Sequence, residues 1–136
     1  PMYTSEFPND ERLIEAVRTC PTLLQTRLNA QSDARVVTIG SATFAAERRR
    51  DQDDPPDWRE IDPEGRGFRL VEAENLESQA TMVATKLGLR FTAQDWVRTQ
   101  EGNVFVEANP AGQWLFLPDD RGNSITGALA DAILTL

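Results

Sequence analysis

Apolar residues follow a helical spacing in three stretches of the chain. The first spans residues 9–21, with Asn9 as a suitable N-cap. The second spans residues 75–87 and is followed by Gly88, the residue type that most often ends a helix in the left-handed conformation. The third begins at Ser124. The apolar residues that share a face are Leu13, Ile14 and Val17 in the first helix and Leu76, Ala80, Val83 and Leu87 in the second. In the third helix, the residues expected to face the core are Ile125, Leu129, Ala132, Ile133 and Leu136.

Shorter segments between these helices have the composition of strands. The predicted strands are residues 35–40 and 43–47, residues 90–98 and 103–108, and one further short segment, residues 114–117. Few residues separate the members of each pair, with Gly40 in the first link and Gly102 in the second, so each pair predicts a hairpin. Hairpins among helices, without βαβ crossovers, predict an α+β fold with an antiparallel sheet and packed helices.

Residues 48–67 show no apolar periodicity. The segment opens with three consecutive arginines, and four aspartates and two adjacent prolines, Pro55 and Pro56, follow within its first ten residues. Long segments without secondary structure are uncommon in compact domains and often functional. We therefore expect residues 48–67 to form a loop that is mobile when no ligand is bound.

Composition limits the chemistry that is available. The 136 residues are enough for one domain, and no apolar run approaches the roughly 20 residues that span a bilayer, so we expect a cytoplasmic protein without a membrane partner. A net charge of −8 argues against nucleic acid as a partner. The absence of histidine excludes Ser-His-Asp hydrolysis and ordinary zinc sites, and the single Cys20 excludes an internal disulfide. A metal here would have oxygen ligands.

Three oxygen-bearing side chains converge in the second predicted hairpin. Glu107 and Asn109 are two residues apart in a strand and so share a face. A turn near residues 101–102 places Asp95 across from Glu107 or Ala108, with opposed Cβ atoms roughly 5 Å apart. Two carboxylates and an amide oxygen suit Mg²⁺. The alternative is a hairpin whose acidic residues face water.

The same stretch carries a resemblance. Val104–Trp114 reads Val-Phe-Val-Glu-Ala-Asn-Pro-Ala-Gly-Gln-Trp and resembles the Phe-Leu-Glu-x-Asn-Pro-x-Gly-Gln-Trp motif of the ATP-grasp ribosomal peptide maturases. Further pieces that match in family order are Tyr3–Glu6, Leu24-Gln25, Asp33–Gly40, Phe44–Glu47, Asp57-Trp58-Arg59 and Leu87–Phe91. The resemblance covers essentially the whole chain, and it implies that residues 1–136 are the C-terminal part of an ATP-grasp domain.

The resemblance implies a division of the chain and a role for individual residues. Residues 28–47 would be the hinge and hairpin, residues 48–67 the mobile loop and residues 75–136 the lobe that binds metal and phosphate. The implied Mg²⁺ ligands under ATP are Asp95, Glu107 and Asn109, and Asn109 would also contact the nucleotide. Arg59 would contact phosphate or the acyl-phosphate intermediate, Arg35 would lie beside the ribose or substrate, and Arg48 would be a further basic contact. The adenine would be bound by Gln25, Thr26, Arg27 and Leu28.

The activity implied is that of an ATP- and Mg²⁺-dependent ligase. It would activate a carboxylate of a ribosomal precursor peptide as acyl phosphate and join it to a hydroxyl or amine, closing a macrocycle. Family members have a preface domain and a first lobe that carries two phosphate-binding lysines, so we expect the chain to be a fragment without full activity and the complete enzyme to be a homo-oligomer. The alternatives are another ATP-grasp carboxylate–amine ligase and a non-catalytic peptide-binding module.

Overall fold

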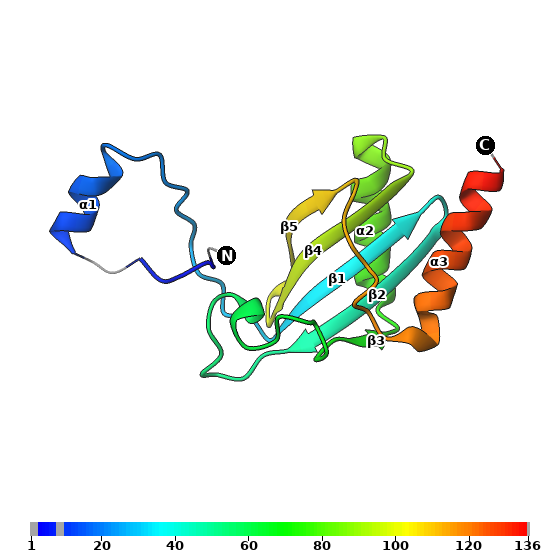
Figure 1. Ribbon diagram of the computed structural model, residues 1–136, viewed down its shortest axis with the longest axis horizontal. Helices are drawn as coiled ribbons and strands as arrows, with labels where there is room; N and C mark the ends of the chain where they lie inside the picture. The colour runs from blue at the N-terminus through cyan, green and yellow to red at the C-terminus, as the bar shows by residue number, and fades with distance from the viewer. Residues whose placement is uncertain (1–2, 8–9, 136) are drawn as a thin grey trace.

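The protein is described by a computed structural model of residues 3–7 and 10–135. Its elements are α1 (Glu11–Val17), β1 (Ser32–Ile39), β2 (Ala42–Arg49), the 3-10 turn η1 (Trp58–Glu60), β3 (Arg69–Val71), α2 (Glu74–Leu87), β4 (Phe91–Thr99), β5 (Gly102–Asn109) and α3 (Asp119–Leu134). The strands form one sheet and the helices lie outside it (Figure 1), which confirms the predicted α+β class.

The sheet has the strand order β3-β2-β1-β4-β5, and every neighbouring pair is antiparallel. Both predicted hairpins, β1–β2 and β4–β5, are confirmed. The sequence did not predict β3, because three residues are too few to show an alternating pattern. β3 and β5 are the edge strands of the sheet.

Each face of the sheet has its own core, because neighbouring residues of a strand point to opposite sides. On one face Val36 of β1 packs with Leu76 and Ala80 of α2. On the other face Val37 of β1 packs with Ile125 of α3. α2 and α3 therefore lie on opposite faces, and α3 occupies only one end of its face (Figure 1), which leaves the other end free for a site.

The helices differ from the prediction mainly at their ends. Gly88 ends α2 with φ 66° and donates its N–H to the carbonyls of Ala84 and Thr85, as predicted. Leu87 is more than half exposed, and the buried position of the last turns is Ala84. In the first helix, Asp10 caps the first turn by accepting a hydrogen bond from the N–H of Arg12. Asn9 and Leu136 lie outside the described residues, and so do the side chain of Leu13 and its part in the predicted face.

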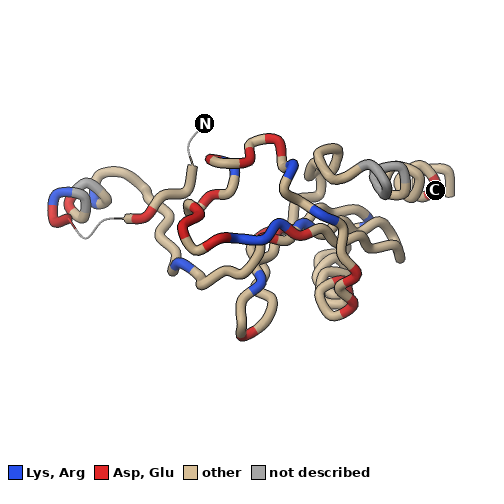
Figure 2. The backbone as a smooth tube through the Cα atoms, turned by 90° about the horizontal axis from the view of Figure 1, so that it is seen from below, with Lys and Arg blue, Asp and Glu red and all other residues tan. Residues whose placement is uncertain are grey.

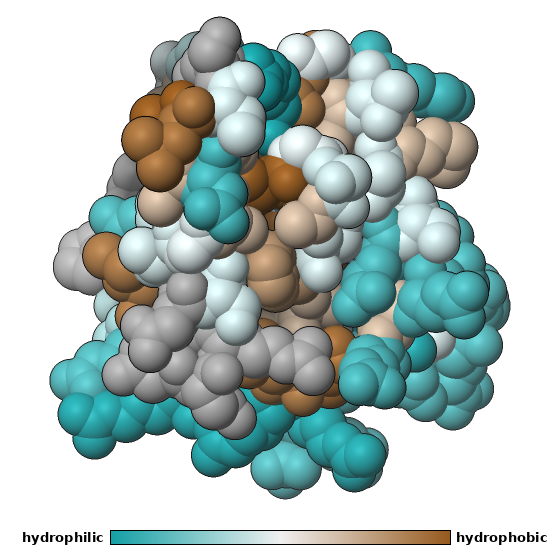
Figure 3. Space-filling view, turned by 90° about the vertical axis from the view of Figure 1, so that its right-hand side faces the viewer, coloured by the Kyte–Doolittle hydropathy of each residue, from teal (hydrophilic) through white to brown (hydrophobic). Residues whose placement is uncertain are grey.

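The predictions for α3 need two corrections. α3 begins at Asp119 and not at Ser124, since the chain leaves Pro118 directly into the helix. Ile133 faces solvent with 59% of its surface exposed, so only the earlier apolar positions of α3 contact the core. Figure 3, which views the side of the molecule where α3 lies, shows apolar residues among polar ones on this surface.

Residues 114–117 do not form the predicted strand. They make a turn in which the N–H of Leu117 donates to the carbonyl of Trp114 over 2.9 Å. β5 ends at Asn109, and Pro110 has no N–H with which to extend the sheet. From there the chain crosses the face of the sheet to reach α3 (Figure 1). The apolar residues that predicted a strand, Trp114, Phe116 and Leu117, pack onto that face instead.

Residues 48–67 are held by paired charges and one aromatic anchor. Arg48 pairs with Asp54 and Asp62, Arg50 pairs with Asp33, and Trp58 packs against Phe68 at a ring-centroid distance of 5.1 Å. Figure 2 shows basic and acidic positions following one another along the backbone. The segment thus has more anchors than its sequence indicated, and its mobility stays a prediction.

The N-terminal part of the chain extends away from the sheet. α1 lies apart from the other elements, at the end of the molecule opposite α3 (Figure 1). Residues 21–30 are an extended connection outside the sheet. Within the described residues, no helix has the length and apolar character required to cross a membrane.

Candidate functional site

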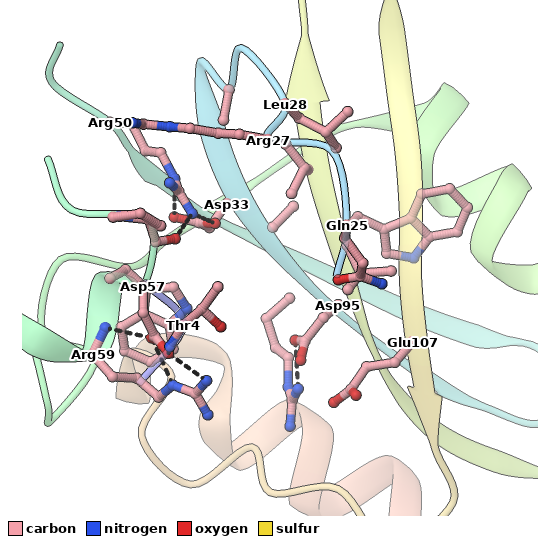
Figure 4. Close-up of a pocket in the computed structure, with 18 of the residues that line it drawn as sticks. Thr4, Gln25, Arg27, Leu28, Asp33, Arg50, Asp57, Arg59, Asp95 and Glu107 are labelled. Atoms are coloured by element: carbon pink, nitrogen blue, oxygen red, sulfur yellow. Dashed lines mark hydrogen bonds and ion pairs between the residues drawn. The ribbon is translucent and has the colours of Figure 1, made fainter. Parts of the chain in front are cut away.

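A wide cavity of about 1640 Å³ opens above the end of the sheet that α3 leaves free. Its floor is formed by side chains of β1, β4 and β5. Its walls are formed by the N-terminal segment, by the segment around Asp57 and by residues 110–118, which cross the sheet and are called the crossing segment below (Figure 4). Nine of the ten residues that the sequence assigned to nucleotide, metal or substrate line it: Gln25, Thr26, Arg27, Leu28, Arg35, Arg59, Asp95, Glu107 and Asn109. Residues up to 84 positions apart in sequence (109 − 25) thus meet in one place.

Asp95 and Glu107 are direct cross-strand partners on β4 and β5, and Asn109 pairs with Ala93 two residues further along the ladder. All three residues therefore lie on the same face, which confirms the predicted register. The ladder shifts between Asp95 and Trp96, because Trp96 pairs with Phe105 and leaves Val106 as an extra residue. This bulge lies next to the carboxylate pair. Bulges are common beside functional sites, where they change the direction of a side chain.

Arg35 connects Asp95 to the crossing segment. Its Nη1 donates to Oδ1 of Asp95 over 2.5 Å, and its Nη2 and Nε donate to the carbonyl of Gln113 over 2.9 and 3.3 Å. The guanidinium also lies over the Phe116 ring, with 5.9 Å from Cζ to the centroid. One arginine thus holds both a strand carboxylate and the backbone of the Asn-Pro-x-Gly-Gln-Trp motif.

Gly112 permits this arrangement. A Cβ at residue 112 would lie 2.6 Å from the Cβ of Ala93 and 3.2 Å from Nη2 of Arg35. The N–H of Gly112 donates to the carbonyl of Asn109, and the N–H of Ala111 donates to the Asn109 side-chain oxygen over 2.9 Å. The motif therefore forms a tight turn pressed onto β1 and β4, with glycine where the backbone comes closest.

A second arginine, Arg59, stands on the opposite wall. Asp57 holds it through two parallel bonds, from Nε to Oδ1 over 2.8 Å and from Nη2 to Oδ2 over 2.7 Å. The hydrogen bonds from Arg59 lower the pKa of Asp57, against the effect of burial. The pKa of Arg59 is raised, chiefly by Asp57 and further by the charges of Asp95 and Glu107. The guanidinium of Arg59 thus lies within the field of both strand carboxylates.

The segment 25–28 forms a wall of the cavity and takes no part in the sheet. Arg27 forms an ion pair with Glu6, which ties this wall to the N-terminal segment. The backbone of an extended segment outside a sheet is available for hydrogen bonds with a ligand. The assignment of Gln25, Thr26, Arg27 and Leu28 to adenine stays a prediction.

Arg48 is the sequence-predicted residue that the structure does not bring to the cavity. Its side chain is only 11% exposed and pairs with Asp54 over 3.0 Å and Asp62 over 3.5 Å. Arg48 therefore holds the folded segment 48–67 together, and of the three consecutive arginines at its start it is Arg50 that lines the cavity.

Sequence reasoning gave no role to Asp33, Arg50 and Asp57, although all three line the cavity. Asp33 and Arg50 form a bidentate pair over 2.6 and 2.7 Å. The one usable signal in the sequence was the spacing Asp57-x-Arg59, which lets a carboxylate at a helix N-cap reach the arginine two residues on.

The oxygen ligands at the end of the hairpin fit a hard cation. Two carboxylates with one amide oxygen and no nitrogen or sulfur donor are a set that Mg²⁺ accepts, since it commonly takes one or two protein carboxylates and fills its shell with water and phosphate. Among the described residues no cluster of three Asp, Glu, His or Cys side chains is placed to hold a metal alone. Asp95 and Glu107 would therefore need Asn109 and a ligand to complete the shell.

The solved structures place this geometry in a known fold. The chain superposes on an ATP-grasp ligase associated with RiPPs from Chryseobacterium gregarium, solved with ADP and a leader and core peptide, at a TM-score of 0.83, 19% identity and 96% coverage of this chain. The chain therefore has the fold of the matching part of an ATP-grasp ligase. It also superposes on the macrocyclase MdnC from Microcystis aeruginosa MRC, solved with its precursor peptide MdnA, at a TM-score of 0.59, 21% identity and 80% coverage of this chain.

The chain spans less than half of these structures, 41% of the Chryseobacterium ligase and 35% of MdnC. The macrocyclase MdnB from the same Microcystis strain aligns with 96% of the chain at a TM-score of 0.56 and 21% identity, over 47% of its own length. No protein-family profile and no curated protein sequence matches the chain. At these identities the likeness establishes the fold, and the activity has to be argued from the site.

Proposed function

We propose that the chain is the C-terminal part of an ATP-grasp peptide ligase that joins a carboxylate of a ribosomal precursor peptide to a hydroxyl or amine of the same peptide. The observation that carries the proposal is the juxtaposition of the Asp95–Glu107 pair with two arginines around one cavity, in a fold shared with ligases of that kind. Residues 28–47 supply hinge and hairpin, and residues 75–136 the end that binds metal and phosphate.

Asp95, Glu107 and Asn109 would hold Mg²⁺ under the phosphates of ATP, the substrate that supplies the phosphoryl group for activating the carboxylate as acyl phosphate. Arg35 holds the carboxylate of Asp95 in place at the cavity through the bond to Oδ1. Arg59 presents a fixed positive charge opposite the carboxylates, where phosphate charge would be neutralised. Ligation also requires that two groups of the peptide are held at reacting distance, and a cavity of about 1640 Å³ has room for both.

Binding of metal and nucleotide can be tested on the chain itself by NMR, which detects weak binding. We expect Mn²⁺ with ATP to broaden the amide signals of Asp95, Glu107 and Asn109, and Glu107→Gln to abolish the broadening. Glu101→Gln, in the exposed turn of the same hairpin, is the matched control and should behave like wild type. Equal broadening in Glu107→Gln, or broadening centred elsewhere, would contradict the proposed site.

Ligation is tested on the complete ligase that this proposal implies. A macrocyclising ligase removes one water from the precursor peptide for each bond formed, so the product mass falls. A ligase that adds a free amine raises the mass, and a peptide-binding module leaves it unchanged. The mass change thus separates the proposed activity from both alternatives.

A further inference from the structure

Arg59 has far more exposure than the carboxylate that holds it. The side chain of Arg59 is 58% exposed, whereas that of Asp57 is 1% exposed. So exposed an arginine side chain can adopt many orientations unless a partner fixes its planar guanidinium. Asp57 does so by accepting two parallel hydrogen bonds from Arg59. The backbone N–H of Arg59 also donates to Asp57 Oδ1 over 3.1 Å. Three bonds thus connect one buried carboxylate to one exposed residue.

The position of Asp57 is fixed by contacts of its two neighbours in the chain, Pro56 and Trp58. Arg50, paired with Asp33 on β1, donates from Nη2 to the carbonyl of Pro56 over 3.0 Å, so the peptide group that precedes Asp57 is tied to the sheet. On the other side Trp58 packs against Phe68 and Phe116. A continuous series of contacts therefore runs from β1 through Arg50 to Asp57, and it ends at the arginine that faces the cavity (Figure 4).

We propose that Asp57 is a positioning residue, which orients the guanidinium of Arg59 toward the carboxylates of Asp95 and Glu107 across the cavity. This inference rests on the proposed function for its consequence, since an Arg59 aimed at this point would contact the phosphates held there. The orientation itself is a property of the protein without ligand. Thr4 adds to it, because its N–H donates to Oδ2 of Asp57 over 3.2 Å and closes the remaining side of the carboxylate.

The first test is spectroscopic and needs no nucleotide. We expect the Nε–H signal of Arg59 to be resolved and slow to exchange in wild type, because the Nε–H is bonded to Asp57. Asp57→Asn should reduce this protection, because the amide removes the charge and one of the two acceptor oxygens. Asp54→Asn is the matched control, since it removes the same charge from the same segment but from a carboxylate that pairs with Arg48. A rapidly exchanging Arg59 signal in wild type, or one unaffected by Asp57→Asn, would overturn the proposal.

The second test asks whether Asp57 acts through Arg59. We expect Asp57→Asn to weaken the binding of Mg²⁺ with ATP by about 10-fold, as loss of a fixed charge-assisted contact does. In an Arg59→Lys background, where the fork is gone, the same change should weaken binding much less. Additive effects would assign Asp57 a merely structural role.

The two tests also separate this inference from the proposed function. If wild type shows no binding of Mg²⁺ with ATP, the proposed function fails while the Arg59 signal still decides the positioning role. If Asp57→Asn does not fold, the wild-type and Arg59→Lys spectra decide it, because only the guanidinium of arginine gives the protected Nε–H signal.

Discussion

Asp95 and Glu107 face each other across β4 and β5, yet their surroundings differ. The side chain of Asp95 accepts a 2.5 Å bond from Arg35, whereas the side chain of Glu107 makes no hydrogen bond or close ion pair within the described part of the chain. Two neighbouring carboxylates repel, and Arg35 compensates only one of them. The site therefore keeps a negative charge that a cation would neutralise.

The first prediction concerns this difference. Glu107→Gln should change the free energy of unfolding by no more than about 0.5 kcal/mol, because the side chain is exposed and unpaired. Asp95→Ala should destabilise the chain by about 1–3 kcal/mol, since it leaves the largely buried guanidinium of Arg35 without its carboxylate. Urea denaturation measures both. Equal effects of the two changes would show that Arg35 does not depend on Asp95.

The second prediction concerns the fork of Arg35. Arg35→Lys keeps the charge but cannot reach Asp95 and the Gln113 carbonyl together, so we expect a loss of about 1–3 kcal/mol in the free energy of unfolding. Arg18→Lys is the control, because Arg18 pairs with Glu15 on the exposed surface of the helical region and should be nearly neutral. A neutral Arg35→Lys would mean that charge alone holds the crossing segment.

The third prediction compares two glycines. Gly112→Ala should destabilise the chain by about 1–3 kcal/mol, because the new Cβ would lie 2.6 Å from the Cβ of Ala93. Gly127→Ala is the matched control: it has open space around it in α3, and alanine should stabilise that helix by about 0.5–1 kcal/mol. Thermal unfolding of both variants checks the sign of each change.

The sequence predicted the parts of the site that follow from local periodicity. The turn near Glu101 brings Asp95 close to Glu107, because antiparallel pairing follows from the position of the turn, and the bulge at Val106, which the sequence did not show, completes the pairing. Gly88 likewise marked the end of α2. These features depend on residues close together in the chain, and the resemblance added the order of motifs that the structure brings together.

Features that depend on distant residues could not be predicted in this way. The apolar run Trp114–Leu117 has a strand-like composition, but Arg35 binds the carbonyl of Gln113 and draws the segment across the sheet. Arg48 and Arg50 are equivalent in sequence terms, and only the fold shows that Arg48 pairs with Asp54 and Asp62 while Arg50 lines the cavity. Tertiary partners decided these cases.

The fourth prediction is a pH dependence. Hydrogen bonds from Arg59 lower the pKa of Asp57 below its ordinary value of 3.8, so the folded state holds the carboxylate ionised more strongly than the unfolded state does. The resulting stabilisation is complete above the unfolded pKa and is lost as the pH falls through the lowered folded value. The difference in free energy of unfolding between wild type and Asp57→Asn should therefore be constant from about pH 5 to 7 and shrink toward acid. A difference that does not vary with pH would contradict this assignment.

The last prediction concerns residues 48–67, which the sequence presents as mobile without ligand. Arg50 is the contact that ties this segment to β1, through Asp33 on one side and the carbonyls of Pro55 and Pro56 on the other. Arg50→Met keeps the aliphatic stem and removes the guanidinium, so amide hydrogen exchange in residues 51–60 should become faster.

Arg49→Met is the control for that change, since Arg49 is exposed at the end of β2 and its loss leaves the Arg50–Asp33 pair in place. If exchange in residues 51–60 is already fast in wild type, the segment is mobile despite its contacts, as the sequence predicts. If exchange is slow in wild type and fast in Arg50→Met, the pair with Asp33 holds the segment, and Asp57 and Arg59 with it, before any ligand arrives. Equal exchange in the Arg49→Met and Arg50→Met variants would show that neither arginine controls the order of the segment, and that Trp58 with Phe68 anchors it instead.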